Sequence, residues 1–327
     1  MHVNPHHVKK SKELDDNIPD KNDRKDPRVI AGLVKDGRSF RPYIPEGIYA
    51  EIRALSGLQV LAQSEITRLK NQIARWFSIY FPNYKDVYGN VGAVSVLMVL
   101  KAAPLPEDIV KLGVDGVNRI WRDAKVRGVG IKRAKALVAA AEHSIGSREA
   151  QEAVRIELQI LRSDYEMQKA REAELMALIE EKIREVSYVN KLLEIRGVGP
   201  KTVIGFVAEA GDITRFDDPK QIQKLAGYAI GKNESGKRKG ESHISYCGRK
   251  RLRYVFYEAA VSVVSHSPEC KSIHQYYTTR EKNPLKKMQS MIAVACKLIR
   301  VFCLILQTGS TYDAAKLMED IRRPVAA

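Results

Sequence analysis

The residues best suited to chemistry in this chain are serines inside a strongly basic loop, residues 231–253. Eight Lys and Arg side chains in this loop are accompanied by only two acids, and four glycines interrupt the run. A solvated charge run is the ordinary explanation of such a stretch. A glycine-rich cationic loop also suits a phosphodiester, whose anion it can surround. Nearby cations would activate a serine nucleophile there, and Ser235, Ser242 and Ser245 are equal candidates on chemistry alone.

The overall charge favours the same kind of partner. The chain has 327 residues, with 55 Lys and Arg against 39 Asp and Glu, a net charge of +16. Such an excess favours a polyanion through counterion release and long-range attraction. A hydrophobic fraction of 44% is enough to bury a core. The composition therefore indicates a folded protein with DNA as the preferred partner.

Cysteine and apolar patterns exclude other classes. The four cysteines, Cys247, Cys270, Cys296 and Cys303, form no CxxC pair and have no His cluster beside them. Reduced thiols are therefore expected rather than a zinc site. The most apolar run, Met291–Gln307, is interrupted by two cations, so no membrane span is expected. The polar N-terminus does not resemble a signal peptide, and these features together predict a cytoplasmic protein.

Two glycine turns share one pattern. Residues 127–134 read Arg-Gly-Val-Gly-Ile-Lys-Arg-Ala, and residues 196–203 read Arg-Gly-Val-Gly-Pro-Lys-Thr-Val. Each precedes an apolar helical run, as in a helix-hairpin-helix turn, where glycines let the backbone approach a phosphate. A tight turn that needs positive φ is the alternative, equally favoured for the first copy. The second copy is favoured for DNA because the basic loop follows it, and the predicted contacts are Gly197, Gly199, Lys201, Lys237, Arg238, Lys239, Arg249 and Lys250.

Asp23 and Asp26 form the one suggestive carboxylate pair. They lie three residues apart at an expected helix start, where they would share a face. Such a pair can bind Mg²⁺ through its oxygens. Capping of the helix N-terminus is the alternative explanation, and no third or fourth acid accompanies the pair.

The elements that position these residues are mostly helices. Apolar residues at helical spacing predict helices, long ones at 46–80 and 148–193 and others at 26–35, 251–265 and 288–307. Several shorter helices are expected over 92–147. The two long helices are predicted to pair as an antiparallel hairpin or coiled coil. The predicted fold is mainly α, with a hairpin over 46–194, a compact C-terminal domain over 195–310 and a tail over 311–327.

Together the segments resemble DEDD-type insertion-sequence transposases, the bridge-RNA-guided recombinases. Matching segments span nearly the whole chain: 3–9, 21–26, 43–49 with the helix to Pro82, 195–200, 208–216, 225–228, 235–236, 243–245 and Gly248. The resemblance implies that residues 1–45 belong to an RNase H-like domain. It also implies that Asp23 and Asp26 are the last two acids of an Asp-Glu-Asp-Asp tetrad that binds Mg²⁺.

The family's C-terminal domain supplies a serine that attacks the DNA backbone, and Ser235 matches this residue. The resemblance also implies a site shared between subunits, so DNA, a guide RNA and further copies of the chain are the expected partners. The family's first Asp and its Glu would precede the segment at which this chain starts. An N-terminally truncated, poorly active transposase is therefore expected. A non-catalytic DNA-binding remnant and a metal-dependent junction-resolving nuclease are the alternatives.

Overall fold

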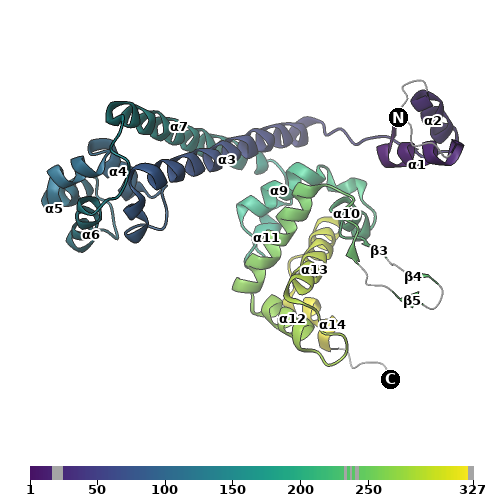
Figure 1. Cartoon of the computed structure of the whole chain (residues 1–327). Helices are drawn as coiled ribbons and strands as arrows, with labels where there is room; N and C mark the ends of the chain where they lie inside the picture. Colours follow the sequence, from purple (N-terminus) through teal and green to yellow (C-terminus); the bar gives the residue numbers. More distant parts are fainter. Residues whose placement is uncertain (17–24, 232–233, 236–237, 240–242, 323–327) are drawn as a thin grey trace.

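Helices make up most of the molecule. A computed structural model describes residues 1–16, 25–231, 234–235, 238–239 and 243–322. The helices in these segments confirm the prediction of a mainly α fold. Figure 1 shows three parts: a small N-terminal unit, a long two-helix hairpin with a helical tip, and a C-terminal domain.

The N-terminal unit consists of two helices and a short strand pair. Helix α1 is Pro5–Asp16 and α2 is Lys25–Lys35, which begins one residue before the predicted helix. Strands β1 (His2–Val3) and β2 (Ser39–Phe40) pair antiparallel. The polar sequence of α1 did not predict a helix, yet the Asn4 side chain accepts a hydrogen bond from the His6 N–H at 2.9 Å. This is an ordinary helix-start contact.

The hairpin is formed by α3 (Gly47–Tyr80) and α7 (Gln151–Ile183), which lie side by side in Figure 1. Its inner face buries Ile66 of α3 and Leu158 of α7, as the helical spacing predicts. The prediction of one helix over 148–193 is wrong at its end. Helix α7 stops at Ile183, and α8 (Val189–Leu193) follows after a turn. The chain turns here because Val186 and Val189 are buried in the core of the C-terminal domain.

The tip of the hairpin has a hydrophobic core of its own. It contains the 3-10 turn Pro82–Asp86 and the helices α4 (Val94–Ala102), α5 (Pro106–Asp123) and α6 (Ile131–Glu142). Both tryptophans of the chain, Trp76 and Trp121, are buried in this core. Each indole N–H donates to a backbone carbonyl, as buried tryptophans usually do.

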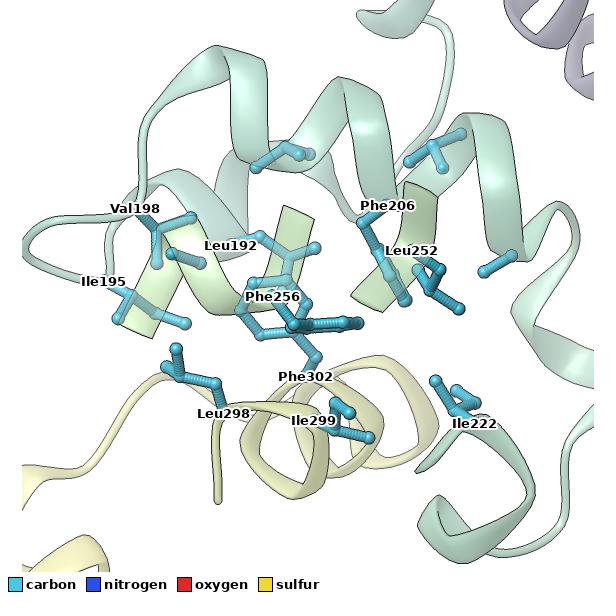
Figure 2. Close-up of a cluster of buried hydrophobic side chains, with 14 of the residues drawn as sticks. Leu192, Ile195, Val198, Phe206, Ile222, Leu252, Phe256, Leu298, Ile299 and Phe302 are labelled. Atoms are coloured by element: carbon cyan, nitrogen blue, oxygen red, sulfur yellow. The ribbon is translucent and has the colours of Figure 1, made fainter. Parts of the chain in front are cut away.

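The C-terminal domain packs helices around three phenylalanines. Its remaining elements are α9 (Pro200–Ala210), the 3-10 turn Ile213–Arg215, α10 (Pro219–Leu225), α11 (Lys250–His266), α12 (Pro268–Thr279), α13 (Lys287–Thr308) and α14 (Ala314–Arg322). In Figure 2, Phe206, Phe256 and Phe302 meet at the centre, edge to face, with centroids 5.3–5.6 Å apart. Ile52 of α3 joins this core and so attaches the hairpin to the domain.

Helix α13 is a core helix with an apolar composition. Among the described residues it is the one helix long and apolar enough to cross a membrane. Leu298, Ile299 and Phe302 lie buried against the rest of the domain, and Lys297 interrupts the apolar run. Its composition is thus explained by packing inside the C-terminal domain.

Candidate functional site

The basic loop contains two short antiparallel strand pairs. Strand β3 (Ile230–Gly231) pairs antiparallel with β6 (His243–Ile244), and this pair closes the loop. Further out, β4 (Glu234–Ser235) pairs with β5 (Arg238–Lys239), which places the backbone of Ser235 opposite that of Arg238. The side chains of these four β4 and β5 residues are outside what the structure describes, as are Lys237 and Ser242 entirely. The candidate nucleophile therefore lies on a β-hairpin that extends from the helical domain (Figure 1).

Two arginines at the base of the loop are held by one glutamate. Arg249 precedes α11 and donates to the backbone carbonyl of Glu209 at 2.9 Å, with its carboxylate 3.3 Å away. Arg251 lies 3.7 Å from the other carboxylate oxygen and donates to the hydroxyl of Ser56 on α3 at 2.5 Å. Burial lowers the pKa of the Arg251 guanidinium, and Glu209 opposes that shift. Arg249, predicted to contact DNA, is thus already engaged within the protein.

Two further guanidinium groups bind the end of α9. Arg53 of α3 donates to the carbonyls of Ala208 and Glu209 at 3.0 and 3.1 Å. Arg215 donates to the carbonyl of Ala210 at 3.0 Å, and burial lowers the pKa of its guanidinium. The last carbonyls of a helix have no intrahelical partner and attract cations. The Arg53 contacts fix the C-terminal domain on the hairpin, whereas the Arg215 contact lies within the domain.

Segments matched by the family resemblance meet at this point. The Asp212 N–H donates to the hydroxyl of Tyr43 at 3.0 Å, and Arg215 stacks on the Tyr43 ring at 4.0 Å. Gly211 has φ +70°, and a Cβ built there would lie 2.5 Å from the same ring. The segments at 43–49 and 208–216 therefore pack against each other through Tyr43.

The second glycine turn is packed against α11. Gly197 has φ +93°, its carbonyl accepts a hydrogen bond from the Ser262 hydroxyl at 2.7 Å, and a Cβ there would lie 2.8 Å from the Val263 Cα. Gly199 is the N-cap residue of α9, has open space at its Cβ position, and lies two residues before the exposed Lys201. Of the three residues predicted to contact DNA in this turn, Gly197 has a packing role, while Gly199 and Lys201 lie toward solvent.

The first glycine turn has the same backbone but different surroundings. Gly128 has φ +77°, and no atom lies within 4 Å of a Cβ built on it. Gly130 is the N-cap residue of α6, as Gly199 is the N-cap residue of α9. The prediction of a tight turn with positive φ is confirmed at the first glycine of both copies.

The carboxylates do not form a metal site within the described residues. Asp26 forms an ion pair with Lys12 of α1, whose side chain is 11% exposed, while Asp23 lies outside the described residues. No group of three or more His, Cys, Asp or Glu is found in the described part of the chain. A cation already neutralises Asp26, so the described residues do not fit a divalent ion, and Mg²⁺ binding by Asp23 and Asp26 stays a prediction.

Of the predicted catalytic residues that the structure describes, Asp26 and Ser235 do not meet in one chain. In Figure 1, α2 with Asp26 and the β4–β5 pair with Ser235 lie in separate parts of the molecule. The hydroxyl of Ser245, one of the alternative nucleophiles, donates to the Gly227 carbonyl at 3.4 Å and accepts from the Cys247 N–H. Ser245 thus has a role in the turn that precedes α11.

Sequence inspection assigned no role to Arg53, Glu209 or Ser56. Arg53 and Ser56 contact residues more than a hundred positions away, and Glu209 contacts Arg249 forty positions away, so local spacing contains no sign of these contacts. The cysteines agree better with expectation. All four are free thiols, with Cys270 and Cys303 buried and Cys247 exposed.

Two regions of the chain match family profiles of known proteins. A family profile described as the transposase IS116/IS110/IS902 family matches residues 189–275, and a DEDD-type IS110 profile described as transposase matches residues 1–82. The chain is also similar to the insertion element IS116 uncharacterized 44.8 kDa protein of Streptomyces clavuligerus. The two are 25% identical over 300 residues, which cover 90% of this chain and 73% of that protein.

The matches fall on the two parts that contain the candidate chemistry, the N-terminal unit with Asp26 and the domain beside the basic loop. By family resemblance the chain is a transposase. Within that class the matched segments resemble both domains of the IS110/IS116/IS902 family.

Proposed function

We propose that the chain binds DNA through its basic loop and that Ser235 is the nucleophile of an insertion-sequence transposase. The observation that supports this most directly is the position of Ser235, on a β-hairpin whose base is fixed to α9 and α3 by Arg249 and Arg251. A fixed base would present the tip of a cationic hairpin to a phosphodiester. The Lys and Arg side chains of the loop and the Ser235 nucleophile would then approach the same phosphate.

The reaction proposed is a transesterification. A bond forms between Ser235 Oγ and phosphorus while the phosphorus–oxygen bond to the leaving nucleoside breaks. The serine hydroxyl gives up its proton, and the departing oxygen takes one up. Loop cations, Lys237, Arg238 and Lys239 among them, would stabilise the charge on the phosphoryl oxygens. The energy of the broken phosphodiester is conserved in the bond between Ser235 and phosphorus. A second DNA hydroxyl can therefore attack this phosphorus, displace the serine oxygen and rejoin the strand.

The carboxylate part of the site would come from another copy of the chain. Asp26 and the Ser235 hairpin lie in separate parts of one molecule, so a composite site requires self-association. An exposed apolar stripe supports it: Ile156, Ile160 and Met167 are 52%, 55% and 44% exposed on one face of α7. Their spacing of four and seven residues is that of a helix–helix seam. Ile160→Glu should therefore lower the molecular mass measured by light scattering.

The test is capture of a covalent protein–DNA adduct. The chain is incubated with end-labelled donor and target DNA, its guide RNA and a divalent metal salt, and an adduct that survives denaturing electrophoresis is expected. Ser235→Ala should abolish the adduct and leave DNA affinity unchanged, because the hydroxyl alone is removed. Ser245→Ala, which loses a hydroxyl from the same loop, is the matched control and should retain the adduct.

Other outcomes would support the alternatives. DNA binding with neither cleavage nor adduct would indicate a non-catalytic DNA-binding protein. Strand cleavage without an adduct would indicate hydrolysis by water, as in a junction-resolving nuclease. An adduct that persists in Ser235→Ala but is lost in Ser242→Ala would move the nucleophile within the loop. Dependence of the reaction on added guide RNA tests the proposed RNA partner.

A further inference from the structure

A second basic segment lies at the tip of the hairpin, remote from the loop that contains Ser235. Residues 119–135 include seven Lys and Arg and a single acid, Asp123. The basic loop 231–253, with eight cations and two acids, has the same net charge. The tip patch consists of Arg119, Arg122, Lys125, Arg127, Lys132, Arg133 and Lys135. The two segments together account for most of the net charge of the chain.

The cations of the tip patch are exposed and unpaired. All seven residues are exposed, and none has a salt bridge to any residue in the described part of the chain. Arg133 is the one with a ring contact, over Tyr88 at 5.2 Å. By contrast, Arg249 and Arg251 in the basic loop share the carboxylate of Glu209. The tip charges are therefore free to bind an external anion.

The patch also has a defined shape. Lys132 and Lys135 lie three residues apart on α6, on the side opposite the buried Ala134 and Leu137. The turn before them has open space over Gly128. Arg122 from the end of α5 lies beside Gly130, 3.9 Å from a Cβ built there. Cations from two helices thus surround an exposed glycine turn, over which a phosphate backbone can approach closely.

The length of α3 in the hairpin sets the scale of the separation between the two basic segments. Ser56 of α3 contacts Arg251 of the C-terminal domain, and Tyr80 lies where α3 reaches the tip. Between these residues α3 advances about 36 Å at roughly 1.5 Å per residue. One helical turn of duplex DNA has about the same length as this part of α3. A duplex longer than about one turn is needed to contact both basic segments.

We propose that the tip patch is a second, sequence-independent contact for the phosphate backbone of duplex DNA. It would act together with the basic loop, so this inference rests on the proposed function. A second contact on the same duplex raises affinity by effective concentration, without any need to recognise bases. The partner is inferred as DNA because the patch consists of cations around an open turn, with no exposed large apolar group besides Ile131 on its surface.

The first experiment measures the salt dependence of DNA binding by fluorescence anisotropy. The probe is a duplex of about 40 base pairs, well over one turn long. The tip variant has Lys125→Gln, Arg127→Gln, Lys132→Gln and Lys135→Gln. Removing four phosphate contacts should make the salt dependence shallower by roughly 3 to 4 in log–log slope. Between about 50 and 200 mM salt, the unsubstituted chain should lose roughly 100-fold more affinity than the variant.

A matched variant controls for net charge. It removes four exposed lysines, on α12, α13, α14 and the segment between α12 and α13, by the substitutions Lys271→Gln, Lys282→Gln, Lys287→Gln and Lys316→Gln. The salt dependence of this variant should stay near that of the unsubstituted chain. Equal effects in the two variants would show a general charge effect and overturn the proposal.

The second experiment locates the DNA by photo-crosslinking. A photoreactive residue at Ile131, 52% exposed within the patch, should crosslink to the duplex. The same residue at Ile145, 84% exposed beyond the other end of α6, should not. Crosslinks from Ile131 to folded RNA but not to the duplex would overturn the assignment to DNA. Duplex binding that the tip variant leaves unchanged overturns this inference alone, whereas a chain that binds no duplex overturns the proposed function.

Discussion

The two glycine turns have nearly the same sequence and opposite surroundings. In each, the first glycine has positive φ and the second is the N-cap residue of a helix. At Gly197 the turn is pressed against α11, where Val263 and Ser262 leave no space for a Cβ. At Gly128 the same turn lies open to solvent. Local sequence thus determines the backbone of a turn, and the packing around it determines what the turn can bind.

This difference separates two roles that one motif can have. The turn at 196–203 attaches α9 to α11 and so supports the domain that positions the basic loop. The turn at 127–134 has open space around Gly128, and its cations form no salt bridge with the described residues. The open turn is therefore the better candidate for direct phosphate contact, although the buried one lies closer to the proposed nucleophile.

Gly197→Ala should have the largest effect. Alanine at positive φ costs about 1–2 kcal/mol, and the close approach to the Val263 Cα adds about 1–3 kcal/mol of overpacking. The free energy of unfolding of the C-terminal domain should fall by about 3 kcal/mol. Urea unfolding followed by circular dichroism measures it. Gly199→Ala, at an open extended position, is the control and should cost less than about 1 kcal/mol.

The two tryptophans allow unfolding of the tip core to be followed separately from unfolding of the C-terminal domain. Trp76 and Trp121 both lie in the tip core, so tryptophan fluorescence follows unfolding of the tip. Gly197→Ala should shift the circular dichroism transition and leave the fluorescence transition nearly in place. An equal shift in both signals would contradict the description of two separate cores.

Ser262→Ala should have a smaller effect on the same domain. The substitution removes the hydroxyl that donates to the Gly197 carbonyl at 2.7 Å. A single lost hydrogen bond at a partly buried carbonyl costs about 1–2 kcal/mol. Ser265→Ala on the same helix is the matched control, because its hydroxyl binds only the carbonyl of Val261 at the surface. If the two substitutions cost the same, the contact between turn and helix does not stabilise the domain.

Helices with a clear apolar stripe were predictable from sequence. The bounds of α3, α11 and α13 agree with their predicted ranges within one residue, because long periodic patterns report burial on one face. Helix α1 was missed because Pro5–Asp16 has no such stripe. Its start was still present in the sequence as Asn4 followed by Pro5, a common helix-start pair.

The candidate site was predictable only in part. Glycine and charge spacing indicated the basic loop and the positive φ at Gly128 and Gly197, since these are properties of a few neighbouring residues. The contacts of Arg53 with α9 and of Arg251 with Ser56 join residues far apart in sequence. No local pattern specifies such pairs. They depend on how α3 crosses the C-terminal domain.

Gly128→Ala tests the open turn and should have the smallest effect of the three. No atom lies within 4 Å of the new Cβ, so only the strain of positive φ remains, about 1–2 kcal/mol. The lower entropy of the unfolded chain with alanine offsets about 0.4–1 kcal/mol of it, which leaves a net loss of about 1 kcal/mol. Tryptophan fluorescence during urea unfolding should show this loss in the tip core, while the circular dichroism of the C-terminal domain stays unchanged. Gly130→Ala, with an extended backbone and only Arg122 at 3.9 Å, is the matched control and should cost less. A loss at Gly128 as large as that at Gly197 would mean that the first turn is also packed against a partner, and the contrast between the two turns would disappear.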